Sequence, residues 1–138
     1  MTGGEMEKVL YQGVKAMDYP VTGEVYYRGT RPLQNGDDPG KEDIVVSVLT
    51  GTADQVQKGS CLVNVYVPDV MVASGAWMKD KRRTDFMELW LAGVPKKLTA
   101  ISGILFRPSA MIVTLKHEGL KEHFVSLKMD FKLLNDNY

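Results

Sequence analysis

A few residues in this sequence could do chemistry, but their spacing does not assemble them into a site. His117 and His123 flank one turn and could meet across it, yet a zinc site normally has four ligands and Cys61 lies in a distant segment. Cys61 alternates with valines, so we expect a thiol that behaves as a small buried hydrophobic residue. We therefore predict two turn-exposed histidines, no metal ligands and no cofactor.

The segment from Gly36 to Lys41 comes nearest to a phosphate-binding loop. Its glycines are one residue too close, Glu42 stands where Ser or Thr would hold magnesium, and a strand follows instead of a helix. Asp37 and Asp38 form a carboxylate pair, but acid–base catalysis needs groups held in fixed geometry, and this stretch is built from flexible residues. We predict no catalytic residue, and a protein that is not an enzyme.

The strongest local charge lies where the main helix should begin. Four of the five residues from 79 to 83 are basic, namely Lys79, Lys81, Arg82 and Arg83. Positive charge at a helix N-terminus opposes the helix dipole and costs about a few tenths of a kcal/mol. It indicates either contact with DNA phosphates or an acidic partner, or simply a solvated helix start, which we favour. Arg28, Arg31 and Lys41 would extend such a patch if their loop lies on the same side.

The connector over residues 69–79 is markedly apolar for a loop, since it contains Met71, Val72, Ala73, Ala76, Trp77 and Met78. Loops normally run over the surface and are polar. The connector either folds back as a flap on its own core or packs against another copy of the chain. We favour the second because Trp and Met are enriched at interfaces. The candidate interface residues are Arg28, Arg31, Met71, Trp77 and Met78.

The elements that position these residues follow from the hydrophobic pattern. Residues 1–4 should be frayed, and apolar residues at helical spacing predict a helix over 5–17 that ends before Pro20. A short strand over 23–27 is followed by a long Gly- and Pro-rich loop over 28–41, which cannot contribute to a core. Alternating residues predict an antiparallel hairpin over 42–68.

The second half of the chain predicts a helix and a closing hairpin. The main helix begins at Asp80 or Thr84, and its apolar stripe comprises Phe86, Leu89, Trp90 and Val94. Gly93 and Pro95 should break it before a further turn. Strands over 110–117 and 122–134 form the last hairpin, the second with one wet face.

These elements predict a single α+β domain over residues 1–138. The expected order is α-β-β-β-α-β-β: a mostly antiparallel sheet of about five strands with two helices packed on one face. Lys plus Arg and Asp plus Glu both number 17, so no global field draws the chain to nucleic acid or an anionic membrane. The single cysteine, the absence of a signal-like start and the absence of a bilayer-length apolar run predict an intracellular protein with no membrane partner.

Several phrases, read with the order of elements, resemble a known family. GEVYYRGTRP, KEDIVVSVLTG, VQKGSCLVNVYVPD and the closing FVSLKMDFKLL are similar to the tail terminator or tail-completion proteins of long-tailed bacteriophages and prophages, over residues 5–134. The resemblance implies a ring, commonly of six subunits, that caps the tail tube and joins it to head-connector proteins. It implies no active site. It also implies assembly in the bacterial cytoplasm, then a place in the virion tail neck.

By position, the resemblance would turn the 28–41 loop and the 69–79 connector toward neighbouring subunits or the tube. The basic residues Lys79, Lys81, Arg82 and Arg83 would line the lumen, where non-specific DNA contact is conceivable. The alternatives are a head-completion or joining protein and, in another class, a small nucleic-acid- or ligand-binding domain that uses Lys79–Arg83 with Tyr26, Tyr27 and Trp77. Steeply salt-dependent DNA binding would favour the last.

Overall fold

Alternating residues of three long strands build the core. The computed structural model describes residues 1–27, 31–32, 40–52 and 56–134. In this part of the chain, β2 (Asp43–Gly51), β3 (Val56–Pro68) and β8 (Glu122–Leu134) are antiparallel neighbours. Their register places Val46, Val63 and Leu127 in one row, and all three are fully buried. The predicted hairpin over 42–68 and the predicted alternation in the last strand are thereby confirmed.

The sheet is mixed and has six strands among the described residues. β1 (Val25–Tyr26) pairs parallel to β2, while β6 (Leu105–Pro108) and β7 (Val113–Lys116) both pair antiparallel with β8. The prediction of about five mostly antiparallel strands is thus only roughly right. It missed β6, a short strand of four residues that ends at Pro108, and it began β7 too early.

The first helix, α1 (Gly3–Lys15), begins earlier than predicted. Thr2 accepts a hydrogen bond from the backbone N–H of Glu5, while the Glu5 side chain accepts one from the backbone N–H of Thr2. This reciprocal capping box satisfies N–H groups that a helix end leaves unpaired, so the expectation that residues 1–4 are frayed is wrong. Met6, Leu10 and Val14 face the core, and the helix packs on β1 and β2.

The second helix, α2 (Lys81–Ala92), confirms only part of the predicted stripe: Trp90 packs against the core and Val94, in the next helix, is fully buried. Met87 and Leu91 are fully buried, whereas Phe86 is 46% exposed and Leu89 is 77% exposed. Asp80 is the N-cap, since its side chain accepts from the backbone N–H of Arg83. The buried face of α2 is therefore next to the face that the sequence predicted.

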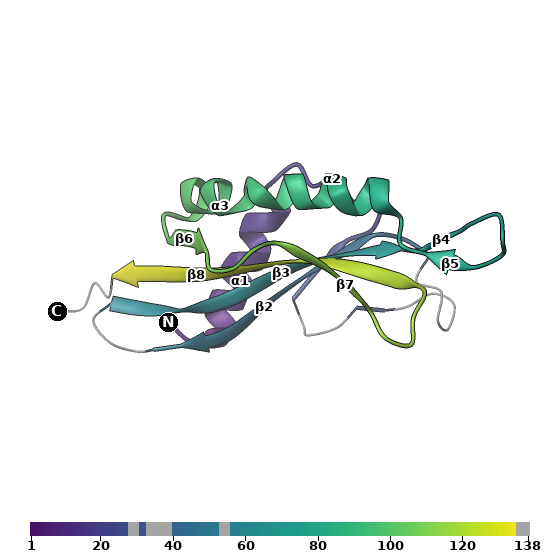
Figure 1. Cartoon of the computed structure of the whole chain (residues 1–138). Helices are drawn as coiled ribbons and strands as arrows, with labels where there is room; N and C mark the ends of the chain where they lie inside the picture. Colours follow the sequence, from purple (N-terminus) through teal and green to yellow (C-terminus); the bar gives the residue numbers. More distant parts are fainter. Residues whose placement is uncertain (28–30, 33–39, 53–55, 135–138) are drawn as a thin grey trace.

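The predicted break at Gly93 is confirmed, because the chain turns there and starts again as α3 (Val94–Ser102), with Pro95 in its first turn. Pro is well placed in the first turn because its missing N–H would be unpaired there. The two helices run one after the other along the sheet, and α1 lies behind the strands (Figure 1). Three described helices, rather than two, cover the face on which the core lies. None of the described helices combines the length and apolar character needed to cross a membrane.

Candidate interaction surface

The apolar connector forms a small ribbon that extends beyond the main sheet. β4 (Val70–Met71) pairs antiparallel with β5 (Trp77–Met78), so the expectation of a loop is corrected here. The turn is closed by a bond from the Val72 N–H to the Ala76 carbonyl, 2.9 Å. Gly75 lies in the turn with φ of 87°, a conformation that glycine adopts without strain. Figure 1 shows the ribbon at one end of the molecule, away from the helix layer.

The ribbon exposes the apolar side chains that the sequence singled out. Met71 is 60% exposed, Trp77 is 40% exposed and Met78 is 54% exposed, with Val70 beside them. Met71 and Trp77 are cross-strand partners, and the Lys121 ammonium lies 4.7 Å from the centre of the Trp77 ring. The ribbon thus does not fold back as a flap on the core. Its apolar side chains lie on both faces of the ribbon, Met71 with Trp77 on one and Val70 with Met78 on the other.

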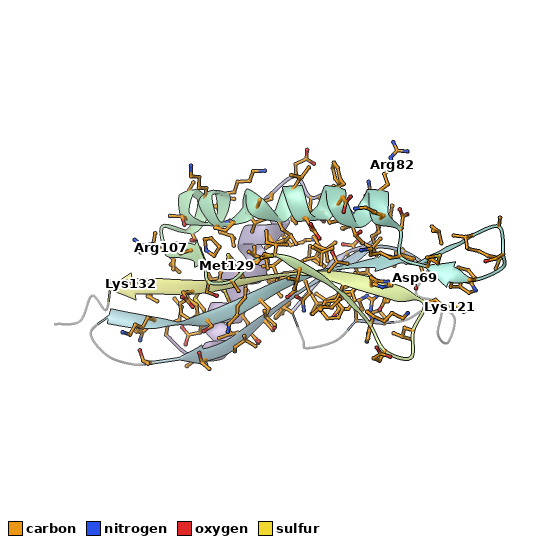
Figure 2. The ribbon with its side chains drawn as sticks, in the orientation of Figure 1. Asp69, Arg82, Arg107, Lys121, Met129 and Lys132 are labelled. Carbon is orange, nitrogen blue, oxygen red and sulfur yellow. The ribbon has the colours of Figure 1, made fainter. Side chains whose placement is uncertain are left out.

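Asp69 anchors the base of the ribbon. Its backbone N–H donates to the carbonyl of Lys121, and its carboxylate, only 2% exposed, contacts two cationic or polar groups. His123 Nδ1 lies 2.7 Å from one oxygen and Lys116 Nζ lies 3.3 Å from the other. Figure 2 shows Asp69 and Lys121 together where the ribbon leaves the sheet. The arm therefore leaves the domain from a fixed point.

The other end of the ribbon leads into α2, whose first turn is also tied down. Arg83 donates from Nε and Nη2 to the two carboxylate oxygens of Glu42, at 2.8 Å each, and from Nη2 to the carbonyl of Pro20. The hydrogen bond to Glu42 raises the pKa of Arg83. A bidentate pair of this kind fixes orientation as well as charge.

The basic run does not form one free cationic surface. Arg83 is engaged by Glu42, and Lys81 donates to Asp85 at 2.7 Å, a bond that raises the pKa of Lys81. Lys79 and Arg82 remain exposed, and the Arg82 side chain points away from α2 (Figure 2). The charge of the run is therefore divided among three different environments.

Arg31 lies inside the domain, against the helix-free face of the sheet. Its Nε donates to Asp43 at 3.0 Å, and its Nη1 donates to Glu122 at 3.1 Å, while Nη2 bonds the second Glu122 oxygen. The guanidinium carbon also lies 4.2 Å from the centre of the Tyr66 ring. This corrects the expectation that the 28–41 loop cannot contribute to a core. Arg28 lies outside the described residues.

The prediction of two turn-exposed histidines is corrected, since the side chain of His117 is 36% exposed, that of His123 is 19% exposed, and each bonds a buried carboxylate. His117 Nδ1 bonds Glu122, whose side chain is fully buried, whereas His123 Nδ1 bonds Asp69. His117 also packs beside Tyr66, with ring centres 5.5 Å apart. Each imidazole ring thus bonds a different carboxylate, and the two histidine–carboxylate pairs lie on opposite faces of the sheet at the same end.

Sequence reasoning missed the buried carboxylates that hold this end together: Glu42, Asp43, Asp69 and Glu122. Asp43 and Glu122 are the first residues of β2 and β8, and Glu42 and Asp69 lie one residue outside β2 and β3, where alternation gives no signal. All are bonded to basic or polar side chains, so they act as anchors.

Among the described residues, no group of three or more His, Cys, Asp or Glu side chains is placed to hold a metal ion. Three hollows of about 410, 210 and 520 Å³ are lined by none of the four buried carboxylates. Burial, with a smaller contribution from the charge of Asp130, raises the pKa of Cys61 to about 12, so its thiol stays protonated.

No family model matches this sequence, and neither does any curated protein.

Proposed function

We propose that this protein is a non-enzymatic assembly protein, a tail terminator that forms a ring on the end of a phage-type tail tube. The observation that carries the proposal is the β4–β5 ribbon. It exposes Met71, Trp77 and Met78 on an arm outside the core, and large exposed apolar patches on soluble domains usually mark contact sites. A rigid base at Asp69 holds the arm in one direction, which reduces the entropy lost on docking.

A ring needs two different complementary surfaces on each subunit, because a head-to-tail contact closes only when each copy offers both halves. The outward face of α2 supplies a second apolar surface, with Phe86 at 46% and Leu89 at 77% exposure. We infer that the ribbon of one subunit docks on the α2 face of the next. The proposed partners are further copies of the chain, six in the ring that the resemblance implies, together with tail-tube and head-connector proteins. Assembly would take place in the bacterial cytoplasm and end in the tail neck.

The basic run gives less support to DNA binding. Glu42 engages Arg83, which removes one charge from a surface at Lys79–Arg83, while the Lys81–Asp85 pair is exposed and weak. A head-completion or joining protein would use the same kind of apolar contact, so it differs from a terminator in the partner that it binds.

The test is the mass of the full-length protein in solution, alone and with purified tail tubes, by sedimentation velocity, combined with electron microscopy of negatively stained samples. A terminator gives an annular oligomer, free in solution or at the end of a tube. Binding to head connectors without binding to tubes would favour the joining protein. A monomer under both conditions would contradict the proposal.

A further inference from the structure

A basic hollow lies at the end of the sheet remote from the ribbon. It has a volume of about 410 Å³ and is lined by residues from β2, β3, β6 and β8. Lys58, Arg107 and Lys132 line it, each from a different strand, and Figure 2 shows Arg107 and Lys132 at this end, far from Lys121 and the ribbon. These three side chains are exposed. The hollow shares no residue with the proposed subunit contact.

Two of the basic side chains at the hollow are placed where they lower the stability of the sheet. Lys58 and Lys132 are directly opposite each other across β3 and β8, where like charges destabilise a sheet. Lysines often protect the open edges of sheets, but β3 and β8 are both interior strands. Within the described part of the chain, none of Lys58, Arg107 and Lys132 forms an ion pair. Charges that break a local rule without a compensating partner often mark a functional site.

The rest of the lining suits a phosphate group. The hydroxyls of Thr50 and Ser60 hydrogen-bond each other at the hollow, 3.2 Å apart, which leaves one hydroxyl hydrogen free to donate to an anion. Gly51 and Gly59 also line the hollow. Arg107 offers the planar fork that binds phosphate oxygens in pairs. Asp130, opposite Arg107 in the register, is the one carboxylate in the lining, so positive charge remains in excess.

We propose that this hollow binds the phosphate group of an anionic ligand. Its volume lies within the usual range for small-molecule sites, roughly 300–1,000 Å³. Both a nucleotide and a nucleic-acid backbone carry phosphate groups. Binding of ATP and binding of duplex DNA are therefore measured separately. The proposal does not depend on ring formation.

The experiment measures binding of ATP by calorimetry and of a fluorescein-labelled DNA duplex by anisotropy, each at low and at moderate salt, with inorganic phosphate as competitor. Arg107→Glu and Lys132→Glu should each weaken binding by about tenfold or more. Lys96→Glu and Lys97→Glu are matched controls, because they make the same charge changes at exposed positions on the helix layer and should alter binding less than about twofold. Thermal unfolding verifies that all four variants are folded, and Lys132→Gln repeats the test without adding a negative charge.

If phosphate displaces bound ATP, and only the hollow variants lose ATP binding, the ligand is a small phosphorylated molecule. Binding of the duplex alone, with affinity falling steeply as salt rises, identifies a nucleic-acid backbone. Failure of the wild-type protein to bind either probe would overturn the proposal. Equal losses in Lys96→Glu or Lys97→Glu would also overturn it, because the effect would then follow net charge and not the hollow.

Discussion

Arg31 bonds both carboxylate oxygens of Glu122, a residue ninety-one positions further along the chain. The same guanidinium bonds Asp43 and lies over the Tyr66 ring. The Arg31 side chain, from the segment before β2, thus contacts three strands. It reaches Asp43 at the start of β2, Glu122 at the start of β8 and Tyr66 near the end of β3. The side chains of Arg31, Asp43 and Glu122 are all at most 4% exposed, so water screens none of these contacts.

Replacing Arg31 with alanine should therefore destabilise the protein strongly. Asp43 and Glu122 would be left buried without their shared cation, and breaking a buried ion pair from one side costs about 3–5 kcal/mol. The measurement is the free energy of unfolding in urea at neutral pH. Arg82→Ala is the control, because Arg82 is exposed and should change stability by no more than about 0.5 kcal/mol. A loss below about 1 kcal/mol for Arg31→Ala would show that the buried network contributes little.

The two faces of α2 give a second prediction. Met87→Ala and Leu91→Ala should each cost about 2–5 kcal/mol, because both side chains are fully buried and their loss leaves a cavity. Leu89→Ala should cost no more than about 0.5 kcal/mol, since Leu89 is mostly exposed. Urea unfolding of the three variants checks the order. A larger loss for Leu89→Ala would place the core on the face that the sequence pattern favoured.

The buried faces that could be predicted from the sequence are those with a regular spacing of apolar residues. β8 alternates apolar and polar residues over its length, so its buried face was predictable from Val125, Leu127 and Met129 alone. In α2, Phe86 and Leu89 lie at helical spacing, as do Met87 and Leu91, and periodicity gives no reason to choose between two apolar faces. The choice is made by tertiary packing, since Thr84 and Met87 complete the face that meets the sheet.

The site was predictable only in part, for a similar reason. The apolar content of the connector pointed to Met71, Trp77 and Met78, and the structure places these three on one exposed ribbon. Arg31 could not be placed, because its partners Asp43 and Glu122 are brought to it by strand pairing and not by nearness in sequence.

The Cys61 thiol gives a prediction on pH. Its pKa rises from 9.0 to about 12 in the folded protein, chiefly through burial. Between these values the unfolded chain loses the thiol proton while the folded chain keeps it, so this contribution to stability is complete below pH 9 and is lost as pH rises toward 12. The slope from this one group reaches about 1.4 kcal/mol per pH unit.

Urea unfolding at a series of alkaline pH values measures that slope. Burial also raises the pKa of Tyr66, so other groups contribute and a comparison is needed. Cys61→Ala removes only the thiol, and its stability should fall less steeply with pH than that of the wild type. A thiol reagent should react with native Cys61 far more slowly than with the unfolded chain. Equal slopes in the two proteins would show that Cys61 is not held protonated by folding.

The last prediction separates a head-to-tail contact from a symmetric one. Trp77→Glu should abolish self-association while leaving the free energy of unfolding within about 1 kcal/mol of the wild type, because Trp77 lies on the ribbon outside the core. Leu89→Glu should do the same from the other side of the contact. Met111→Glu, at a position 83% exposed between β6 and β7, is the control and should still associate.

Mixing the two defective proteins then decides the geometry. Each Trp77→Glu subunit keeps an intact α2 face, and each Leu89→Glu subunit keeps an intact ribbon, so a head-to-tail contact allows one productive interface and gives a dimer that cannot grow. Sedimentation velocity of the separate and mixed proteins detects that dimer. If the ribbons instead pair with each other, Leu89→Glu alone will still associate and the mixture will form no new species. If Trp77→Glu unfolds the domain, the ribbon is part of the core and the subunit contact must be sought elsewhere.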